Sequence, residues 1–334
     1  MGQLSSLKAI ALLVAAFIVV GCKGEPLSVC RAPTLAKAAP STDGMVFIKA
    51  GTFEMGARPM RPEEGTPRTT KVGAFWMDRT EVTNGDFARF VAATGYVTLA
   101  ERPLDAKAYP ELSGNDLKPS GIVFAGEKPA VLNDPRQWWR VVQGADWRHP
   151  EGPKSSMKGK GAWPVVQIGW DDAMAYAKWL GRDLPTEAEW EYAAQGGKTA
   201  TRYVWGDKPL DEIRPQANVW QGTFPGYDSG GDGYKARAAP VGCFGANGFG
   251  LHDMAGNVWE WAKDVYHPGF AASGETVMFE LGDPGARNHV IKGGSFLCSP
   301  NYCYRYRPAA REPGPSDTGE NHIGFRTVLR VVGP

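Results

Sequence analysis

Glycine and proline interrupt this chain so often that long regular elements cannot form over most of its length. The chain of 334 residues contains 42 glycines and 26 prolines, and both residue types end helices and strands and favour turns. The 12 tryptophans supply large apolar side chains that can hold irregular segments together. The composition therefore predicts a globular domain with little regular secondary structure, anchored by buried aromatic rings, and the strands and helices expected below make it an α+β domain.

The N-terminus has the layout of a secretory signal peptide. Lys8 precedes an apolar run from Ala9 to Val20, and small residues follow the run. About a dozen apolar residues are fewer than the roughly 20 that a membrane-spanning helix needs. We therefore expect residues 1–21 to be a signal peptide and the mature protein to be exported.

Cys22 directly follows Gly21, and this pair resembles the lipid-attachment site of bacterial lipoproteins. The alternative is an ordinary signal peptide that happens to contain a cysteine. Residues 22–44 are rich in proline and lack a sustained apolar period, which predicts a lipidated N-terminus and tether. We expect the protein to be anchored to a membrane, facing the periplasm or the cell surface, with a single folded domain over residues 45–334.

The charge balance excludes nucleic acid as a partner. The chain has 37 Lys and Arg against 36 Asp and Glu, and no basic block. The five histidines are scattered, and neither a nucleophile elbow nor a phosphate loop is present. The usual sequence signals of a hydrolase are therefore missing. From the charge balance we expect no binding to nucleic acid. We also expect the protein to be a monomer.

Alternating apolar residues predict a few short strands. Residues 45–56 predict two strands around a turn at Ala50–Gly51, and residues 73–78 predict a third. Residues 96–160 read as loop, although they carry three tryptophans, and residues 164–170 predict another short strand. The residues expected to be buried in the first two strands are Val46, Ile48, Phe53 and Met55.

Three helices have recognisable start signals. Thr83 is expected to cap a helix that Gly95 ends, and Asp171 or Asp172 to cap a second that ends at Gly181. A third helix is expected over residues 184–194, with Thr186 as its cap. In that helix Glu187, Glu189 and Glu191 favour the positive helix N-terminus, so we interpret them as capping residues and not as catalytic carboxylates.

Five cysteines are unusual enough in an exported chain to need an explanation. Cys298 and Cys303 are five residues apart, so any pairing between them requires a turn, which Pro300–Asn301 can provide. This spacing permits a structural disulfide, the default in an oxidising compartment, and equally a shared metal ion. Cys30 and Cys243 are expected to pair with each other or to stay free, and the tether position of Cys30 favours a free or intermolecular state.

Several segments resemble the formylglycine-generating enzyme (sulfatase-modifying factor) family from about residue 45 to residue 331. The resemblance implies that family's irregular fold of the C-type-lectin-like superfamily. Its broad motifs also occur in sulfoxide synthases and in non-catalytic members, whereas the cysteine pair within residues 293–307 is specific to active members. The matching segments are Asp146–Pro153, Pro164–Ala173, Leu184–Gly197, Gly248–Trp261 and Gly293–Arg326.

The resemblance implies a copper-dependent oxidase. Its expected reaction converts the cysteine of a Cys-x-Pro-x-Arg-like segment in an unfolded client sulfatase to Cα-formylglycine, using O2 and a thiol reductant. Cys298 and Cys303 are implied as Cu(I) ligands, which agrees with the preference of Cu(I) for soft thiolates. Ser295, Tyr302 and Trp259 are implied to line the site, and Ser299 stands where the best-known members have a histidine.

The resemblance also implies two structural calcium sites built from oxygen ligands, which calcium prefers. The alternative is that the Asp232–Gly233 and Gly256–Asn257 pairs are simple turns. The first implied set is Asn218, Val219, Asp232 and Tyr234, and the second is Asp253, Gly256, Val258 and Glu260.

Four arginines follow the second cysteine, and they have two interpretations. They could hold the backbone of the client or pair with carboxylates, and the structural role is favoured because arginine commonly forms ion pairs. Two other functions compete with the oxidase: a non-catalytic lipoprotein with a structural or surface-assembly role, and an iron-dependent sulfoxide synthase. The cysteine pair argues against the first, and the absence of a histidine-based iron site against the second. The arginines are Arg305, Arg307, Arg311 and Arg326.

Overall fold

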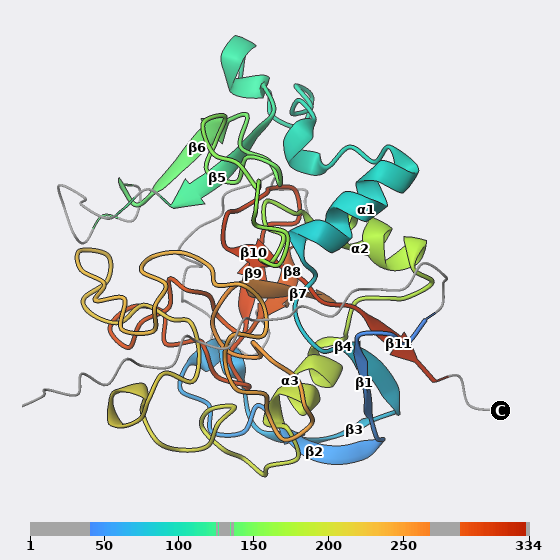
Figure 1. The fold of residues 1–334 in the computed structure, drawn as a ribbon, viewed down its shortest axis with the longest axis vertical. Coiled ribbons are helices and arrows are strands. Elements are labelled where there is room, and N and C mark those ends of the chain that lie inside the picture. Colours follow the sequence, from blue (N-terminus) through green and yellow to red (C-terminus); the bar gives the residue numbers. More distant parts are fainter. Residues whose placement is uncertain (1–40, 125, 127–133, 135–136, 268–287, 332–334) are drawn as a thin grey trace, which may run out of the picture.

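The computed structural model describes residues 41–124, 126, 134, 137–267 and 288–331. Figure 1 shows three helices and several small sheets joined by long irregular segments, as the composition predicts. Within these residues, no helix combines the length and the apolar character that crossing a bilayer requires. The predictions for the signal peptide, Cys22 and most of the tether lie outside the described residues.

The first sheet joins the two ends of the domain. It contains β1 (Met45–Ile48), β4 (Phe75–Asp78) and β11 (Val328–Arg330), with both neighbours antiparallel to β4. The chain already contacts the domain before β1, because Arg182 Nη2 donates to Ser41 O at 2.6 Å. The folded part therefore includes the last residues of the predicted tether.

The next two strands form a separate hairpin. β2 (Gly51–Met55) pairs with β3 (Arg68–Val72), a strand that the sequence patterns did not predict. The predicted positions of β1 and β2 are confirmed, but the two strands belong to different sheets. Ile48, Phe53 and Met55 are buried as expected, whereas Val46 is only partly buried.

A four-stranded sheet forms the centre of the molecule. Its order is β10 (Ile323–Gly324), β7 (Trp259–Val265), β8 (His289–Lys292) and β9 (Glu312–Gly314), and β10 is parallel to β7. Helix α3 (Glu187–Gln195) packs against β7 and β8 on one side and against the β2–β3 hairpin on the other. The chain that leaves β8 leads directly into the segment that carries the cysteine pair.

The helices follow their capping signals with one correction. In α1 (Asn84–Thr94), Thr83 Oγ1 accepts from Asp86 N, and Gly95 ends the helix in the left-handed conformation, so both predicted ends are confirmed. Thr186 caps α3 in the same way through Glu189 N. The predicted cap of α2 (Trp170–Trp179) is wrong, because the cap is Gly169 and the carboxylate of Asp172 accepts from Gly169 N at 2.9 Å.

Two other predictions are corrected. Residues 164–170 form no strand; Val165 N instead donates to Val82 O at 2.9 Å, and the segment crosses the core as irregular backbone. Part of the predicted loop over residues 96–160 is a hairpin of β5 (Ser120–Phe124) and β6 (Trp139–Gln143). Among the described residues, the short 3-10 helices include Pro62–Glu64, Leu99–Glu101, Gly114–Leu117 and Leu210–Glu212.

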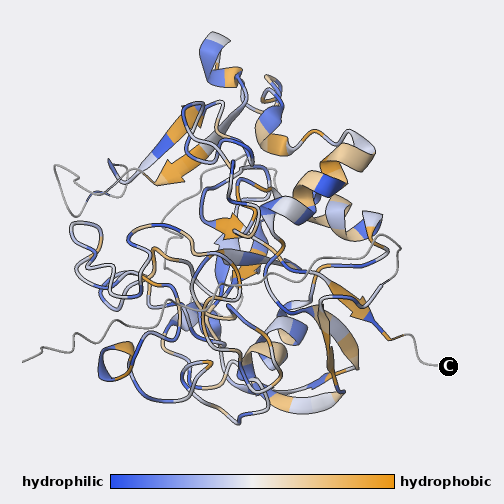
Figure 2. Ribbon diagram, in the orientation of Figure 1, coloured by the Kyte–Doolittle hydropathy of each residue, from blue (hydrophilic) through white to orange (hydrophobic). Residues whose placement is uncertain are grey.

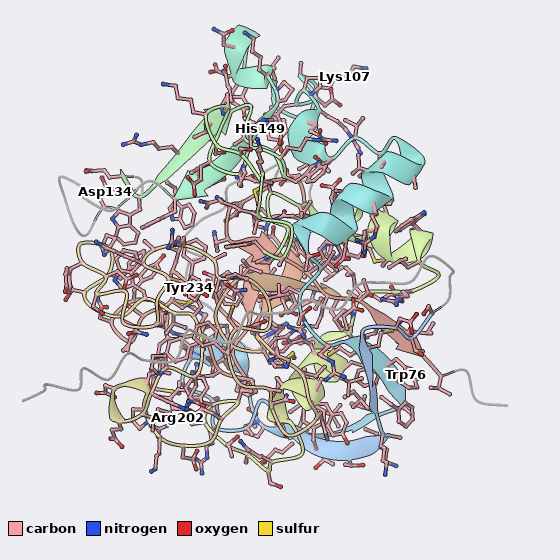
Figure 3. The ribbon with its side chains drawn as sticks, in the orientation of Figure 1. Trp76, Lys107, Asp134, His149, Arg202 and Tyr234 are labelled. Atoms are coloured by element: carbon pink, nitrogen blue, oxygen red, sulfur yellow. A yellow bond between two sulfur atoms is a disulfide. The ribbon has the colours of Figure 1, made fainter. Side chains whose placement is uncertain are left out.

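Aromatic side chains hold the irregular segments together. Figure 2 shows apolar residues scattered along the loops as well as on the strands, and Figure 3 shows side chains filling the space between the loops. The main core includes the fully buried rings of Trp190 and Trp261, and a second cluster contains Trp138, Trp220 and Phe224. The predicted role of tryptophan as an anchor is confirmed at these positions.

Candidate functional site: a buried cysteine pair beside an aromatic cluster

Two glycines direct the chain from β8 into the site. Gly293 has a φ of 91° and Gly294 a φ of 73°, both in the left-handed region that favours glycine. A Cβ atom on Gly293 would lie 3.0 Å from Cζ2 of the buried Trp190 ring. The backbone therefore turns sharply against α3 immediately before the cysteine segment.

Cys298 and Cys303 are joined in a disulfide, with their Cα atoms 4.7 Å apart. Both side chains are buried, with exposed fractions of 1% and 6%. Ser299 O accepts from Tyr302 N at 3.2 Å and from Tyr304 N at 3.0 Å, which closes the predicted turn around Pro300–Asn301. The structure therefore brings the two sulfurs together, and the disulfide is the state in which it holds them.

Of the other predicted site residues, Ser295 and Tyr302 lie in the cysteine segment, and Trp259 lies in a separate strand. Ser295 is fully buried directly before the turn, and Cys298 N donates to Ser295 O at 2.9 Å. Burial raises the pKa of Tyr302 to about 12, so its hydroxyl is protonated at neutral pH. Trp259 starts β7 and belongs to the same apolar core as the two cysteines.

An aromatic cluster that the sequence did not assign to the site surrounds Tyr302. The Phe224 ring stacks on Tyr302 with centroids 4.2 Å apart, and Trp138 meets Tyr302 edge-on at 5.2 Å. Within the described residues, the buried Trp138 Nε1–H has no hydrogen-bond partner. The Trp138–Trp139 pair is visible in the sequence, but its position beside Tyr302 depends on the β5–β6 hairpin, which the sequence patterns did not predict.

The arginines after Cys303 pair with carboxylates, so the interpretation favoured from sequence is confirmed. Each of the four forms an ion pair with a glutamate, and Arg326 and its partner are among the most deeply buried. The guanidinium groups are therefore occupied by internal partners. The pairs are Arg305 with Glu63 and Glu312, Arg307 with Glu64, Arg311 with Glu187, and Arg326 with Glu260.

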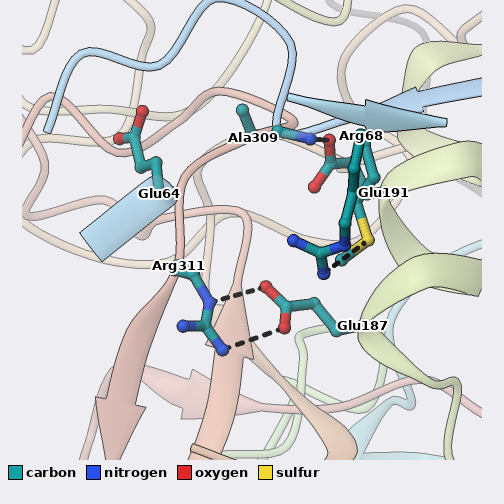
Figure 4. A pocket seen from close by; sticks show the side chains of 8 residues that line it. Glu64, Arg68, Glu187, Glu191, Ala309 and Arg311 are labelled. Atoms are coloured by element: carbon teal, nitrogen blue, oxygen red, sulfur yellow. Dashed lines mark hydrogen bonds and ion pairs between the residues drawn. The ribbon is translucent and has the colours of Figure 1, made fainter. Parts of the chain in front are cut away.

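A small cavity lies within this network of buried charges. Its volume is about 10 Å³, enough for about one water molecule. Figure 4 shows Arg311 donating two hydrogen bonds to Glu187 at its edge, at 2.8 and 3.0 Å. The pKa of Glu187 is lowered because Lys292 and Arg311 outweigh the effect of its burial. The charges are matched, and the cavity is too small for a substrate.

The first predicted calcium set contains an unused buried oxygen. Within the described residues, Asn218 Oδ1 has no hydrogen-bond partner, although Asn218 is 1% exposed. Asp232 lies next to it, because its Oδ2 accepts from Val219 N at 3.1 Å and its Oδ1 from Tyr234 N at 3.0 Å. A buried amide oxygen without a partner is unfavourable, and a hard cation would satisfy it, so these residues fit calcium.

The second predicted calcium set lies beside a cluster of buried carboxylates. Burial, together with repulsion from Asp253 and Glu260, raises the pKa of Glu81 well above its usual value. Burial also raises the pKa of Asp253. Arg326 lowers both pKa values, and His252 also lowers that of Asp253, but burial and the repulsion between carboxylates outweigh them. Among the described residues no group of three or more Asp, Glu, His or Cys side chains is arranged to hold a metal ion, so a cation at this set would need backbone carbonyls as well as carboxylates.

Glu260 keeps one acceptor position open for such a cation. Arg326 donates to Glu260 Oε2 at 2.6 Å and to Oε1 at 2.7 Å, and Trp190 Nε1 donates to Oε2 at 2.8 Å. A carboxylate has about four acceptor sites, and donors among the described residues occupy three of those on Glu260, which leaves one on Oε1. Gly256 and Val258 directly precede β7, within four residues of Glu260 in the same segment.

Cys243 corrects one expectation. It is disulfide-bonded, so it is not the free thiol that the sequence allowed. Cys30 lies outside the described residues.

Comparisons with known proteins match this chain to one family over most of its length. The family model described as the sulfatase-modifying factor enzyme 1-like domain matches residues 32–331. The formylglycine-generating enzyme of Mycobacterium tuberculosis is 49% identical over 296 residues, which cover 86% of this chain and 98% of the relative. The enzyme of the same name from Thermomonospora curvata is 45% identical over 289 residues, which cover 85% and 92% of the two chains.

Solved structures support the fold independently. PvdO from Pseudomonas aeruginosa superimposes with a TM-score of 0.58 at 24% identity, covering 90% of this chain and all 100% of the other. At this identity the likeness speaks for the fold alone. The predicted irregular single-domain fold is therefore confirmed, and the chain belongs to the formylglycine-generating enzyme (sulfatase-modifying factor) family.

Proposed function

We propose that this protein oxidises a cysteine of client sulfatases to Cα-formylglycine, using Cu(I) held by Cys298 and Cys303. The observation that carries the proposal is the placement of two buried sulfurs, brought together by a turn, beside the aromatic cluster of Tyr302, Phe224 and Trp138. The relatives named formylglycine-generating enzyme support the same activity. Their names leave the metal and the oxidant open, so both belong to the proposal.

The two sulfurs fit a cuprous ion by their chemistry. After reduction of the disulfide, the thiolates of Cys298 and Cys303 would hold Cu(I), which soft sulfur ligands select. The bound metal would supply the oxidising chemistry with O2 that protein side chains lack. The residues around the pair exclude water, because both cysteines and Ser295 are buried. In this environment the client thiol meets sulfur and aromatic carbon, and the nearby arginines are already paired with glutamates.

The proposed reaction needs a reductant as well as O2. Oxidising a CH2–SH side chain to an aldehyde removes two electrons, whereas reduction of O2 to water takes up four. Two further thiols must therefore supply the other electrons and become a disulfide, while the client sulfur leaves as hydrogen sulfide. The same class of reductant opens the Cys298–Cys303 disulfide before the metal binds.

The client segment must be extended when it binds. Its cysteine has to reach a buried pair, and a folded sulfatase would keep that side chain inaccessible. We propose a linear Cys-x-Pro-x-Arg-like segment of an unfolded sulfatase as the substrate, a mode of binding in which side-chain pockets give specificity. Within the described part of the chain the buried Trp138 Nε1–H has no hydrogen-bond partner, and we propose it as a donor for such a segment.

We also propose export and lipid attachment at Cys22, with the domain held at the periplasmic or outer surface of a membrane as a monomer. The support is the signal-peptide pattern and the cysteine that follows it. Metabolic labelling with a radioactive fatty acid tests the attachment, and a Cys22→Ser variant should lose the label while keeping the catalytic domain folded.

Calcium is proposed as a structural ion at the two oxygen-rich sets. The unused Asn218 Oδ1 supports the first set, and the cluster of buried carboxylates supports the second. Removal of calcium with a chelator should lower the melting temperature, and re-addition of calcium should restore it. In an Asn218→Leu variant the response to the chelator should become smaller; an unchanged response would rule out the first set.

A defined peptide assay tests the central proposal. The protein is reduced, loaded with Cu(I) and incubated under air with a Cys-x-Pro-x-Arg peptide and a thiol reductant, and mass spectrometry is used to detect the aldehyde. The aldehyde should form under air and be absent under nitrogen. A peptide with serine in place of cysteine is the matched substrate control. Failure of the loaded protein to modify the cysteine peptide would leave the non-catalytic lipoprotein as the better description.

A further inference from the structure

The cysteine turn is attached at its first residue and at its tip to one neighbouring segment, residues 220–224. At the first end, Trp220 N donates to Cys298 O at 3.1 Å. At the tip of the turn, Phe224 N donates to Asn301 Oδ1 and Asn301 Nδ2 donates to Phe224 O, both at 3.3 Å. The Asn301 side chain therefore makes one accepted and one donated hydrogen bond to the backbone of Phe224, as a paired strand residue would, and joins two segments that are distant in sequence.

Ser299 fixes the orientation of the Asn301 side chain. Its Oγ–H donates to Asn301 Oδ1 at 2.6 Å, and Ser299 is 0% exposed. The Ser299 carbonyl also accepts from the amides on either side of Cys303, those of Tyr302 and Tyr304. The hydroxyl of Ser299 thus supports the Asn301 side chain, which bonds to Phe224. The carbonyl of Ser299 holds the two residues that flank Cys303. Only a residue with a short side-chain hydroxyl can make the bond to Asn301 without moving the turn.

We infer that Ser299 and Asn301 form a latch that determines how readily Cys298 and Cys303 close into a disulfide. The latch holds the turn in the conformation in which the sulfurs meet, so it raises the effective concentration of one thiol at the other. The two residues are positioning residues, since they act on the sulfurs through the backbone. The inference rests on the proposed function only in taking this pair as the reactive site.

Equilibration with glutathione tests the latch without copper, client or O2. The two thiols of the reduced protein exchange with one glutathione disulfide, giving the Cys298–Cys303 disulfide and two molecules of glutathione. The fraction closed is read by mass spectrometry after alkylation. Ser299→Ala and Asn301→Ala should each lower the equilibrium constant for closure about tenfold, as expected when hydrogen bonds worth roughly 1.4 kcal/mol support only the closed turn.

Asn247 provides a matched control. Its Nδ2 donates to Ala193 O at 2.8 Å and its Oδ1 accepts from Phe249 N at 3.0 Å, so it is also an asparagine that bridges backbone segments, in another part of the fold. Asn247→Ala should lower the melting temperature but leave the closure constant unchanged. An unchanged constant in both latch variants would overturn the inference, and so would an equal fall in the Asn247 control.

The proposed oxidase and the latch can fail separately. If reduced protein makes no aldehyde but the latch variants shift the glutathione equilibrium, the latch stands and the oxidase falls. If aldehyde forms and the closure constant does not respond to Ser299→Ala or Asn301→Ala, the latch falls and the oxidase stands.

Discussion

Two neighbouring regions of this molecule bury different kinds of side chain. Around α3 and β8, charged side chains are buried in matched pairs, as between Lys292 and Glu191 at 3.2 Å. Around the turn at Cys298 and Cys303, sulfur atoms are buried among aromatic rings, including the stacked Phe224 and Tyr302. The chain passes from one region to the other within a few residues.

The difference shows which groups are available for chemistry. A buried charge that is already paired contributes to a defined structure, and its hydrogen bonds would have to break before it could bind a substrate. A buried thiol has no such commitment once its disulfide is reduced. The arginines that follow Cys303 in sequence therefore fix the backbone, and the two sulfurs are the groups that we propose to react.

Loss of a sulfur should produce the largest change in activity. Cys303→Ser should reduce aldehyde formation below detection, because one thiolate no longer offers the paired soft ligands of the proposed site. The free energy of unfolding should fall by only about 2 kcal/mol, since the disulfide closes a short loop. Peptide turnover is measured on the reduced, Cu(I)-loaded protein, and urea unfolding on the oxidised protein. Retention of a tenth or more of the turnover would contradict the assignment, and Cys243→Ser is the control for loss of a disulfide outside the site.

Breaking a charge pair in the same chain segment should mainly lower the free energy of unfolding, whereas loss of a sulfur should mainly lower turnover. Arg307 donates to Glu64 Oε2 at 3.0 Å, and side-chain exposures are 2% and 0%. Arg307→Met should lower the free energy of unfolding by about 3–5 kcal/mol, because Glu64 is left buried without its cation. The double variant with Glu64→Gln should recover part of the loss. A fall of less than about 1 kcal/mol in urea unfolding would show that the pair is not a structural support.

A carboxylate near the aromatic cluster should make stability depend on pH. Burial raises the pKa of Glu320 to about 7, and its Oε2 lies 3.5 Å from Nδ1 of His322. Burial lowers the pKa of His322 to about 3, so the ring is neutral. A protonated Glu320 can donate to this Nδ1, which within the described residues has no hydrogen-bond partner.

The sign of the effect follows from the raised pKa. The folded state binds the Glu320 proton more tightly than the unfolded state, so its contribution to stability is complete below about pH 4.5 and is lost as pH rises through about 7. Glu320→Gln keeps a donor without the charge, so its stability relative to the wild type should rise between these pH values, by up to about 3 kcal/mol. Urea unfolding at pH 5 to 8 measures the difference. A difference that stays flat with pH would contradict the raised pKa.

The sequence predicted the elements whose signals are local. The caps at Thr83 and Thr186 involve bonds within three residues, so residue pattern alone locates the starts of α1 and α3. The turn between Cys298 and Cys303 was predictable for the same reason, because Pro300–Asn301 favours a turn in any context. The ion pairing of the arginines followed from a general preference of this side chain.

The sequence did not predict features that depend on distant partners. The β5–β6 hairpin brings Phe124 opposite Trp139, and no local pattern marks this pairing. Residues 164–170 are apolar like a strand, but Gln167 N donates to Glu320 O and the segment joins no sheet. The attachment of Asn301 to Phe224 is equally non-local, and so the aromatic side of the site became visible only in the fold.

The smallest effect is expected where an ion pair is exposed. Arg58 Nη1 lies 2.7 Å from Asp207 Oδ1, with side-chain exposures of 49% and 55%. This pair joins a guanidinium to a carboxylate, as the Arg307–Glu64 pair does, but water solvates both partners when the exposed pair is broken. Arg58→Ala should therefore change the free energy of unfolding by no more than about 0.5 kcal/mol, and added salt should reduce the change further. A loss in urea unfolding comparable to that of Arg307→Met would mean that burial is not what separates structural charges from surface charges in this fold.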